Sequence, residues 1–195
     1  MNLDTPVRDY MAEHMDKARE RVIDELLVMR CQEGGREVFE LLVRRWQRRL
    51  WWYARRLAGS DDAAWDVMQE TWITILRQIR KLSDPAWFAA WAYRIVRNKC
   101  ADHCRRASRQ RNLAAGLAER HRANDDPPRE GPGAAVAEAL QRLPPDRQEL
   151  LALKYGADLN IIEIAVVLGV PAGTIKSRLH HAREELRRIL EGDES

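Results

Sequence analysis

Apolar residues along the chain recur every three or four positions, in runs separated by glycine or proline. One run covers residues 22–29 and stops at Gly34 and Gly35, and a second covers residues 39–57 and stops at Gly59. Apolar positions at this spacing fall on one face of an α-helix. No segment of the sequence shows the strict alternation of apolar and polar residues that marks a β-strand. The pattern therefore predicts an all-α fold.

The starts of the next two helices carry capping signals. Ser60 precedes two aspartates, which together supply a cap and a negatively charged first turn for a third helix. Asp84 followed by Pro85 predicts the start of a fourth helix that reaches about Arg106. The buried face expected for the third helix consists of Ala64, Val67, Met68, Trp72, Ile75, Leu76, Ile79 and Leu82.

The composition changes between residues 107 and 133, where polar residues, proline and glycine gather. Segments 125–128 and 131–133 are typical of a linker, while residues 109–122 could instead extend the preceding helix. About 25 residues can extend to ~80 Å, which is enough to tether two lobes that move independently. The sequence thus predicts an amino-terminal extension with a helix at residues 1–30, a first lobe at 31–106, a linker at 107–133 and a second lobe at 134–195.

The overall composition excludes several classes of protein. Of the 195 residues, 45% are hydrophobic and 32% are charged, which is too apolar for a disordered chain and too interrupted by charge for a membrane protein. Charged residues near the start interrupt any secretory signal, so we expect a cytoplasmic protein without membrane insertion. Because the net charge is only +3, an anionic partner would have to bind to local basic patches on the surface.

The seven tryptophans all fall between residues 46 and 91, so the aromatic residues belong mainly to the first lobe. Tryptophan at helical spacing is usually part of a core, and we expect this for most of them. Those that lie beside arginine on an exposed face are candidates for stacking on bases.

Residues 161–178 have the pattern of a helix-turn-helix. The two helices cross at Ala165, which must be small, and Gly169 suits the left-handed turn between them. A polar and basic face follows the turn, as a helix in the DNA major groove requires. A merely solvated helix would show similar charges, but the preceding turn favours DNA binding. We expect this face to consist of Thr174, Lys176, Ser177, Arg178, His180, His181 and Arg183.

Three stretches in and around this motif indicate which class of helix-turn-helix protein the chain resembles. Residues 143–147 read Leu-Pro-Pro-Asp-Arg, residues 163–165 read Glu-Ile-Ala, and residues 168–183 begin Leu-Gly-Val-Pro. Together they resemble the fourth conserved region of RNA polymerase sigma factors of the extracytoplasmic-function (ECF) group. The resemblance implies that the polar face binds the minus-thirty-five promoter element. Members often carry arginine where this chain has His181, so we expect that contact to be weaker or sensitive to pH.

A second, independent resemblance lies in the first lobe. Residues 66–72 read Asp-Val-Met-Gln-Glu-Thr-Trp, residues 91–99 read Trp-Ala-Tyr-Arg-Ile-Val-Arg-Asn-Lys, and residues 102–106 complete the match. These stretches resemble the second conserved region of the same group. An acidic and apolar strip could be solvated surface, but the resemblance implies that it docks on the clamp helices of core RNA polymerase. The strip consists of Asp66, Gln69, Glu70 and Ile73.

The following helix presents a candidate face for single-stranded DNA. Unpaired bases need a flat surface to stack on, cations for the backbone and an amide for the base edge. By resemblance, this face and the loop 81–84 bind the melted minus-ten element, although Trp87 or Trp91 could be buried instead. Ala92 replaces a leucine common in the family, and the loop is short. The resemblance therefore does not specify which base is captured. The minus-ten set consists of Trp87, Trp91, Arg94, Arg97, Asn98, Lys99, Arg105 and Arg106.

The ordered pair of motifs predicts an alternative sigma factor that binds core RNA polymerase and directs promoter recognition and strand opening. Its expected partners are core RNA polymerase, promoter DNA and an anti-sigma factor. The alternative is a dimeric helix-turn-helix regulator that never joins polymerase, and the sequence shows no sensor domain in its support.

The motifs of enzyme sites are missing from the sequence. No phosphate loop, nucleophile elbow or deaminase signature occurs, so we predict no catalytic residues and no small-molecule substrate. Cys100, His103 and Cys104 lie within one helical turn, but their geometry is poor and a fourth zinc ligand is not evident. We therefore predict no metal and no cofactor.

Overall fold

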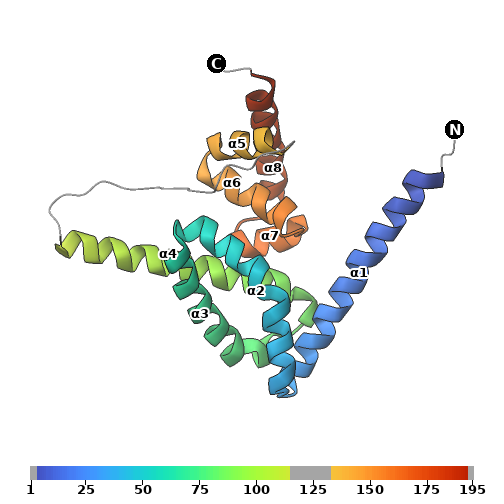
Figure 1. Ribbon diagram of the computed structural model, residues 1–195, viewed down its shortest axis with the longest axis vertical. Coiled ribbons are helices and arrows are strands. Elements are labelled where there is room, and N and C mark those ends of the chain that lie inside the picture. Colours follow the sequence, from blue (N-terminus) through green and yellow to red (C-terminus); the bar gives the residue numbers. More distant parts are fainter. Residues whose placement is uncertain (1–3, 115–132, 193–195) are drawn as a thin grey trace.

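The computed structural model describes residues 4–114 and 133–192, and every regular element in these two ranges is helical. The prediction of an all-α fold is confirmed. Helices α1 to α4 form the first lobe and α5 to α8 the second (Figure 1). In chain order the elements are α1 (Asp4–Gln32), α2 (Arg36–Ala58), α3 (Asp61–Gln78), the 3-10 turns η1 (Ile79–Lys81) and η2 (Pro85–Trp87), α4 (Phe88–Ala114), α5 (Ala134–Arg142), α6 (Pro145–Leu151), the π-helical turn η3 (Ala152–Gly156), α7 (Ile161–Leu168) and α8 (Ala172–Glu191).

The ends of the helices follow from local chemistry. The Ser60 hydroxyl accepts a hydrogen bond from a backbone amide of the first turn and caps α3. Asn160 and Glu163 form a reciprocal capping box at the start of α7. Gly59 and Gly169 end α2 and α7 with φ of 85° and 70°, in the left-handed region that glycine adopts without strain. The left-handed turn predicted at Gly169 is therefore present between α7 and α8.

An aromatic cluster lies at the centre of the first lobe. The Trp46 ring makes edge contacts with Phe88 and Tyr93, at centroid distances of 5.3 and 6.3 Å. Tyr53 extends the cluster, with its ring centroid 5.1 Å from that of Tyr93. Trp46 Nε1 donates to the buried Asp24 carboxylate across 2.9 Å, which satisfies the indole inside the core. These contacts join α1, α2 and α4 and determine which face of α4 points outward.

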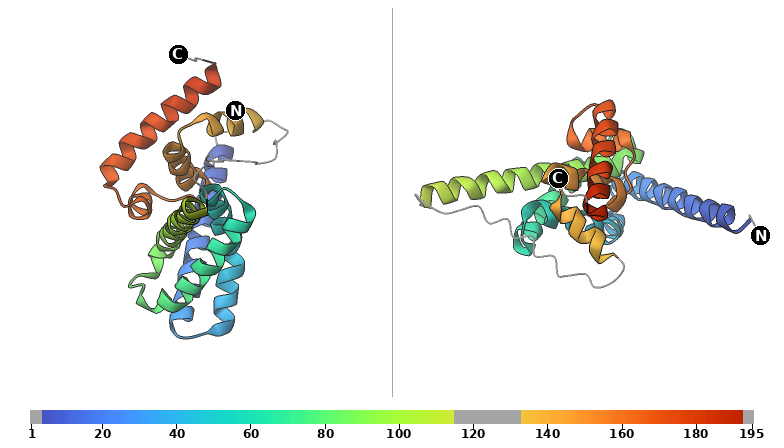
Figure 2. Two further views of the ribbon diagram at one scale, coloured as in Figure 1. Left: turned by 90° about the vertical axis from the view of Figure 1, so that its left-hand side faces the viewer. Right: turned by 90° about the horizontal axis from the view of Figure 1, so that it is seen from above.

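The second lobe packs against the first. Helix α7 lies directly against α4, and the buried residues of the two lobes form one continuous apolar cluster. Figures 1 and 2 show α7 next to α4, with the amino-terminal end of α1 extending beyond both lobes. Within the second lobe, Ile164 of α7 and Ile175 of α8 are fully buried. The lobes are thus in contact in this arrangement, whereas the sequence predicted a linker long enough to tether two lobes that move independently.

The expected buried face of α3 is wrong at one position. Leu76 is 58% exposed, because the helices packed on α3 are α2 and α4 and they leave its side of the helix open.

The fourth helix is longer than expected. It continues to Ala114, so residues 107–114 of the predicted linker are helical. Residues 115–132 of that linker lie outside the described ranges, as do residues 1–3 and 193–195.

Four of the seven tryptophans lie in the core or pack against it, as expected for most of them, and three are exposed. Trp46 is buried, Trp51, Trp72 and Trp91 are half-buried, and Trp52, Trp65 and Trp87 are exposed.

Candidate nucleic-acid interface

The outer face of α4 exposes side chains that were predicted to bind unpaired bases. Trp87 is 36% exposed immediately before the helix, and Arg94 and Asn98 are exposed further along it. Trp91 is half-buried and packs its ring on Phe88, with the centroids 6.1 Å apart. The side of α4 that carries Phe88 is buried in the core. The structure therefore brings an indole, a guanidinium and an amide to one open surface.

The loop before α4 is held in place by α1. The Gln32 side-chain amide donates to the carbonyl oxygens of Ile79 and Leu82, at 3.0 and 2.7 Å. The Asp84 carboxylate accepts a backbone amide and caps the η2 turn that ends at Trp87. These hydrogen bonds fix the backbone on both sides of the loop that leads to Trp87.

Ion pairs join α3 to α4 and connect residues of two predicted sets, the polymerase strip and the minus-ten set. Lys99 and Arg106, which were assigned to the minus-ten set, donate to the Glu70 carboxylate at 3.2 and 2.8 Å. Burial alone would raise the pKa of Glu70, but the hydrogen bonds and charges of Arg106 and Lys99 outweigh burial and lower it. Glu70 therefore stays ionised and holds both cations at the border between the two surfaces.

The four residues of the predicted polymerase strip line one groove between α3 and α4, with a volume of about 380 Å³. Ile73 is 50% exposed in this groove, and Leu76 is exposed one turn further along α3. An apolar patch with a charged rim has the character of a protein-binding surface. The groove is lined by Asp66, Gln69, Glu70, Ile73, His103, Arg106 and Ala107.

Helix α8 turns most of its predicted DNA-binding residues toward solvent. The opposite side of the helix is anchored by Ile175 and Leu179, which are 0% and 5% exposed. The Ser177 hydroxyl donates to the backbone carbonyl oxygen of Thr174 across 3.1 Å, so the Ser177 side chain lies against the first turn of the helix. Thr174 is half-buried, and the exposed members of this face are Lys176, Ser177, Arg178, His180, His181 and Arg183.

Three other predicted arginines lie elsewhere or have acidic partners. Arg97 Nε donates to Glu149 of α6 across 3.0 Å, at the interface between the lobes. Arg105 pairs with Asp102 on its own helix, in a surface contact whose energy is small. Arg183 lines a pocket between the lobes. In this arrangement Arg97 and Arg183 are thus part of the interlobe boundary.

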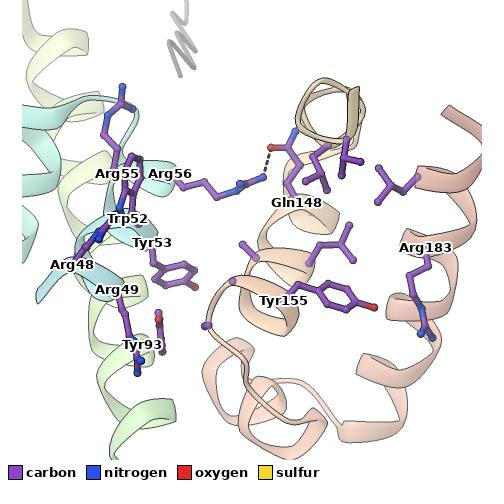
Figure 3. A pocket seen from close by; sticks show the side chains of 17 residues that line it. Arg48, Arg49, Trp52, Tyr53, Arg55, Arg56, Tyr93, Gln148, Tyr155 and Arg183 are labelled. Atoms are coloured by element: carbon purple, nitrogen blue, oxygen red, sulfur yellow. Dashed lines mark hydrogen bonds between the residues drawn. The ribbon is translucent and has the colours of Figure 1, made fainter. Parts of the chain in front are cut away.

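That pocket has a volume of about 730 Å³, and sequence reasoning missed it. Figure 3 shows its two walls, with Tyr53 and Tyr93 on the first-lobe side and Tyr155 on the other. Arg56 reaches across to Gln148, at 3.0 Å. No acidic side chain is among the described residues that line it. Its arginines are Arg48, Arg49, Arg55 and Arg56 of α2 and Arg183 of α8.

Within residues 4–114 and 133–192, no three His, Cys, Asp or Glu side chains gather so that they could hold a metal ion. Burial raises the pKa of the Cys31 thiol, and burial together with Cys104 and Glu149 raises that of Cys100 to about 12, so both thiols stay protonated. None of the described helices is long and apolar enough to cross a membrane.

Comparison with known proteins identifies the family. The family profile of sigma-70 region 2 matches residues 42–110, and that of sigma-70 region 4 matches residues 133–186. The first match covers most of α2, all of α3 and most of α4, and the second covers the helix-turn-helix lobe as far as residue 186 in α8.

Relatives match over most of the chain. The chain is 30% identical to the RNA polymerase sigma-H factor of Pseudomonas aeruginosa over 181 residues, which cover 86% of this chain and 94% of that protein. It is 33% identical to the ECF RNA polymerase sigma factor SigL of Mycobacterium tuberculosis, over 73% of this chain and 82% of that protein. With the ECF RNA polymerase sigma factor SigE of Mycolicibacterium smegmatis it shares 35% identity, over 76% of this chain but only 60% of that protein.

Two solved structures share the fold. CnrH, solved in complex with the cytosolic domain of CnrY, is 25% identical with a TM-score of 0.62, over 88% of this chain and 99% of that one. The sigma factor RpoE of Bartonella quintana, solved with the anti-sigma factor NepR, is 24% identical with a TM-score of 0.65, over 80% of this chain and 98% of that one.

The chain belongs to the sigma-70 family of RNA polymerase sigma factors, in the ECF group. It is an alternative sigma factor, as the two ordered motifs predicted. The comparisons give no support to the free-standing helix-turn-helix regulator.

Proposed function

We propose that three exposed surfaces divide the work of this sigma factor. The groove between α3 and α4 docks on core RNA polymerase, the outer face of α4 holds unpaired bases of the minus-ten element, and α8 reads the minus-thirty-five element in duplex DNA. The proposal rests chiefly on one observation, the exposure of Trp87, Arg94 and Asn98 on the open side of α4. A duplex-reading helix would serve a repressor equally well, whereas this combination of groups suits an unpaired base.

The α4 face would act by making strand separation less costly. Taking a base out of the duplex costs a few kcal/mol, and stacking on an aromatic side chain returns ~1–3 kcal/mol. The Asn98 amide supplies hydrogen bonds for a base edge, and the Arg94 guanidinium offsets the charge of the backbone. Stacking alone does not balance the cost, so all three groups are needed on one surface.

The α8 face would act by direct readout of base edges. Lys176 and Arg178 are exposed cations on the part of the helix that follows the turn, where a recognition helix enters the major groove. Each contact with a base edge contributes ~1–3 kcal/mol of discrimination. The residues that hold α8 in place, Ile175 and Leu179, are buried and take no part in readout.

The proposed work is binding and strand separation, so no residue is assigned a catalytic role. The protein would act in the cytoplasm, where polymerase and chromosomal DNA are found in bacteria. An anti-sigma factor is the proposed antagonist. The solved complex of the similar protein CnrH with the cytosolic domain of CnrY supports a protein partner for this chain.

Reconstituted transcription tests the proposal. Core RNA polymerase is incubated with the full chain on a library of templates, and the transcripts are sequenced. We expect transcripts that depend on the chain and come from templates sharing two separated sequence elements. Lys176→Ala should relax the preference at one position of the upstream element only. Transcription that starts at random, or does not change when the chain is omitted, would contradict the proposal.

A further inference from the structure

One side chain at the end of α1 is bonded to the loop at residues 81–84. Gln32 is the last residue of α1, and its Nε2 atom donates to the backbone carbonyl oxygens of Ile79 and Leu82, at 3.0 and 2.7 Å. The amide nitrogen can donate to both oxygens because it carries a pair of N–H groups. The amide therefore ties the first half of the loop to a helix that lies far away in the sequence.

The turn that follows α1 makes a second contact with this segment. A Cβ atom at Gly34 would lie only 2.8 Å from Nη2 of Arg80, so the Arg80 guanidinium lies directly against the backbone of the turn. Helix α1 also packs against both short turns that flank the loop, η1 and η2. The base of the loop thus lies on α1 and its turn, while Lys81, Ser83 and Asp84 are exposed.

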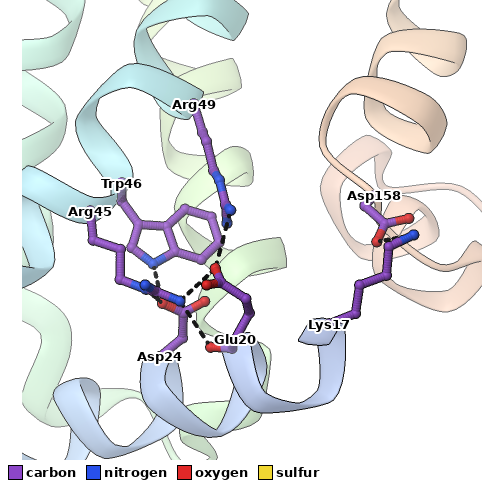
Figure 4. A network of polar contacts seen from close by, with 7 residues as sticks. All are labelled: Lys17, Glu20, Asp24, Arg45, Trp46, Arg49 and Asp158. Atoms are coloured by element: carbon purple, nitrogen blue, oxygen red, sulfur yellow. Dashed lines mark hydrogen bonds and ion pairs between the residues drawn. The ribbon is translucent and has the colours of Figure 1, made fainter. Parts of the chain in front are cut away.

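Helix α1 is fixed on α2 by a separate network of polar contacts (Figure 4). Glu20 pairs with Arg45 at 2.7 Å. Asp24 is only 9% exposed and accepts hydrogen bonds from Arg45 Nε and, at 2.9 Å, from Trp46 Nε1. Breaking a buried pair of this kind is costly, so α1 has a defined position on α2. Gln32 lies about two turns further along the same helix and shares that position.

The loop leads directly into the surface proposed to hold unpaired bases. Ser83 precedes Trp87 by four positions, and a chain of that length spans at most ~14 Å. The Ser83 hydroxyl can donate or accept a hydrogen bond, and the Lys81 ammonium can donate. Stacking on an aromatic ring tolerates any base, whereas hydrogen bonds to a base edge distinguish one base from another. The exposed loop therefore carries groups that can add base selection to stacking on Trp87.

We infer that Gln32 is a positioning residue for base selection, which holds the loop at residues 81–84 where it reads one base of the minus-ten element. The inference rests on the proposed role of the α4 face and gives α1 a part in it. Hydrogen bonds to a base edge weaken steeply with distance and angle, so a loop that moved freely would lose its preference. Gln32 acts only through the loop, because its amide N–H groups are directed at the two carbonyl oxygens.

Two substitutions separate the hydrogen bonds of Gln32 from the shape of its side chain. Gln32→Met keeps nearly the same length but has no donor, and Gln32→Glu places a carboxylate against two carbonyl oxygens. Each neutral hydrogen bond shifts an equilibrium by about twofold to tenfold. We expect Gln32→Met to lower the preference for the selected base by about threefold to thirtyfold, and Gln32→Glu to lower it further.

Hydrogen exchange of the full chain reports the state of the loop without DNA. The backbone amides of Leu82 and Trp87 donate to carbonyl oxygens within this segment, at 3.2 and 3.1 Å. Mass spectrometry of the peptide covering residues 79–87 should show faster exchange in Gln32→Met than in the parent, because the loop opens more often. Equal exchange in the parent and in both Gln32 variants would end the inference at this first step.

Reconstituted transcription measures base preference in the same variants. Core RNA polymerase and the full chain transcribe one library randomised in the minus-ten element and another randomised in the minus-thirty-five element. We expect the Gln32 variants to lose preference at one minus-ten position, and to keep their upstream preference and their affinity for polymerase. A uniform loss at all positions, in step with a lower melting temperature, would mean that Gln32 only stabilises the fold, and would overturn the inference.

Glu33→Gln is the matched control at the same end of α1. Glu33 is exposed, and its side chain forms a surface ion pair with Arg30 at 3.3 Å. Such pairs contribute little, so this substitution should leave loop exchange and base preference unchanged. The same loss of preference in Glu33→Gln would show that any change at this end of the helix has the effect, which contradicts a specific role for Gln32.

Asn98→Ala distinguishes failure of this inference from failure of the proposed function. If Asn98→Ala lowers use of the minus-ten element while the Gln32 variants keep their base preference, the inference is wrong and the α4 face keeps its role. If none of these substitutions alters any minus-ten preference, the proposed role of the α4 face is wrong and the inference is wrong with it.

Discussion

Replacing Trp87 by alanine tests whether the α4 face stacks on an unpaired base. The indole is 36% exposed and lies at the start of the helix, outside the central aromatic cluster. Its removal should cost much less folding stability than the ~3–5 kcal/mol expected for Trp46, which is 4% exposed and bonded to Asp24. A defect in promoter opening by a stably folded Trp87→Ala variant would therefore report a lost DNA contact.

The size of the defect follows from stacking. An aromatic side chain contributes ~1–3 kcal/mol for each stacked base, which corresponds to a factor of about 5 to 150 in the opening equilibrium. Permanganate footprinting, which reports unpaired thymines, measures the open fraction on a fully paired promoter and on one with a mismatched minus-ten element. We expect the defect to be smaller on the mismatched promoter, because the cost of unpairing has been removed in advance.

Trp52→Ala is the matched control for this experiment. Trp52 is 45% exposed, but it lies on α2 and lines the pocket between the lobes, away from the α4 face. Its loss should leave opening by the polymerase complex unchanged. If Trp87→Ala opens the fully paired promoter as well as the parent does, Trp87 makes no stacking contact, and base capture must be sought in the loop at residues 81–84.

The remaining predictions concern the other two surfaces and the turn. Reversing Asp66 and Glu70 to lysine should abolish co-purification with core RNA polymerase, and undiminished binding by a folded variant would remove that role from the groove. Arg178→Ala should cost ~1–3 kcal/mol at one promoter position if it contacts a base, or flatten the salt dependence of binding if it contacts phosphate. Gly169→Ala should lower the free energy of unfolding by ~1–2 kcal/mol, because φ at this position is 70°. Gly173→Ala lies inside α8 and should not destabilise the protein, and thermal melting of the two variants measures the difference.

Local signals in the sequence predicted local structure well. The cap at Ser60, the turn at Gly169 and the exposure of Arg94 and Asn98 opposite the buried Phe88 each depend on residues within a few positions of one another. Helical periodicity relates such residues directly, because positions three and four apart share a face. The fold class and the two exposed helical faces are therefore predictable from the amino-acid pattern alone.

Contacts between distant residues left no signal of this kind. Glu149 is separated from Tyr53 by 96 positions and from Arg97 by 52, and nothing in the pattern around any of the three indicates the others. Periodicity also shows which side of a helix is apolar without showing what covers it. Leu76 is exposed for this reason, since no helix among the described residues packs on its side of α3.

The same limit explains why arginine content is a poor guide to the DNA-binding surface. Arg45 binds Glu20 and Asp24 inside the first lobe, and its contacts fix α1 on α2. Arg97 binds Glu149 of α6, so its guanidinium forms a contact between the two lobes. Arg178 instead lies on an exposed helix face anchored from behind by apolar residues. One residue type thus has three different roles, and only the position of the acidic partner in space distinguishes them.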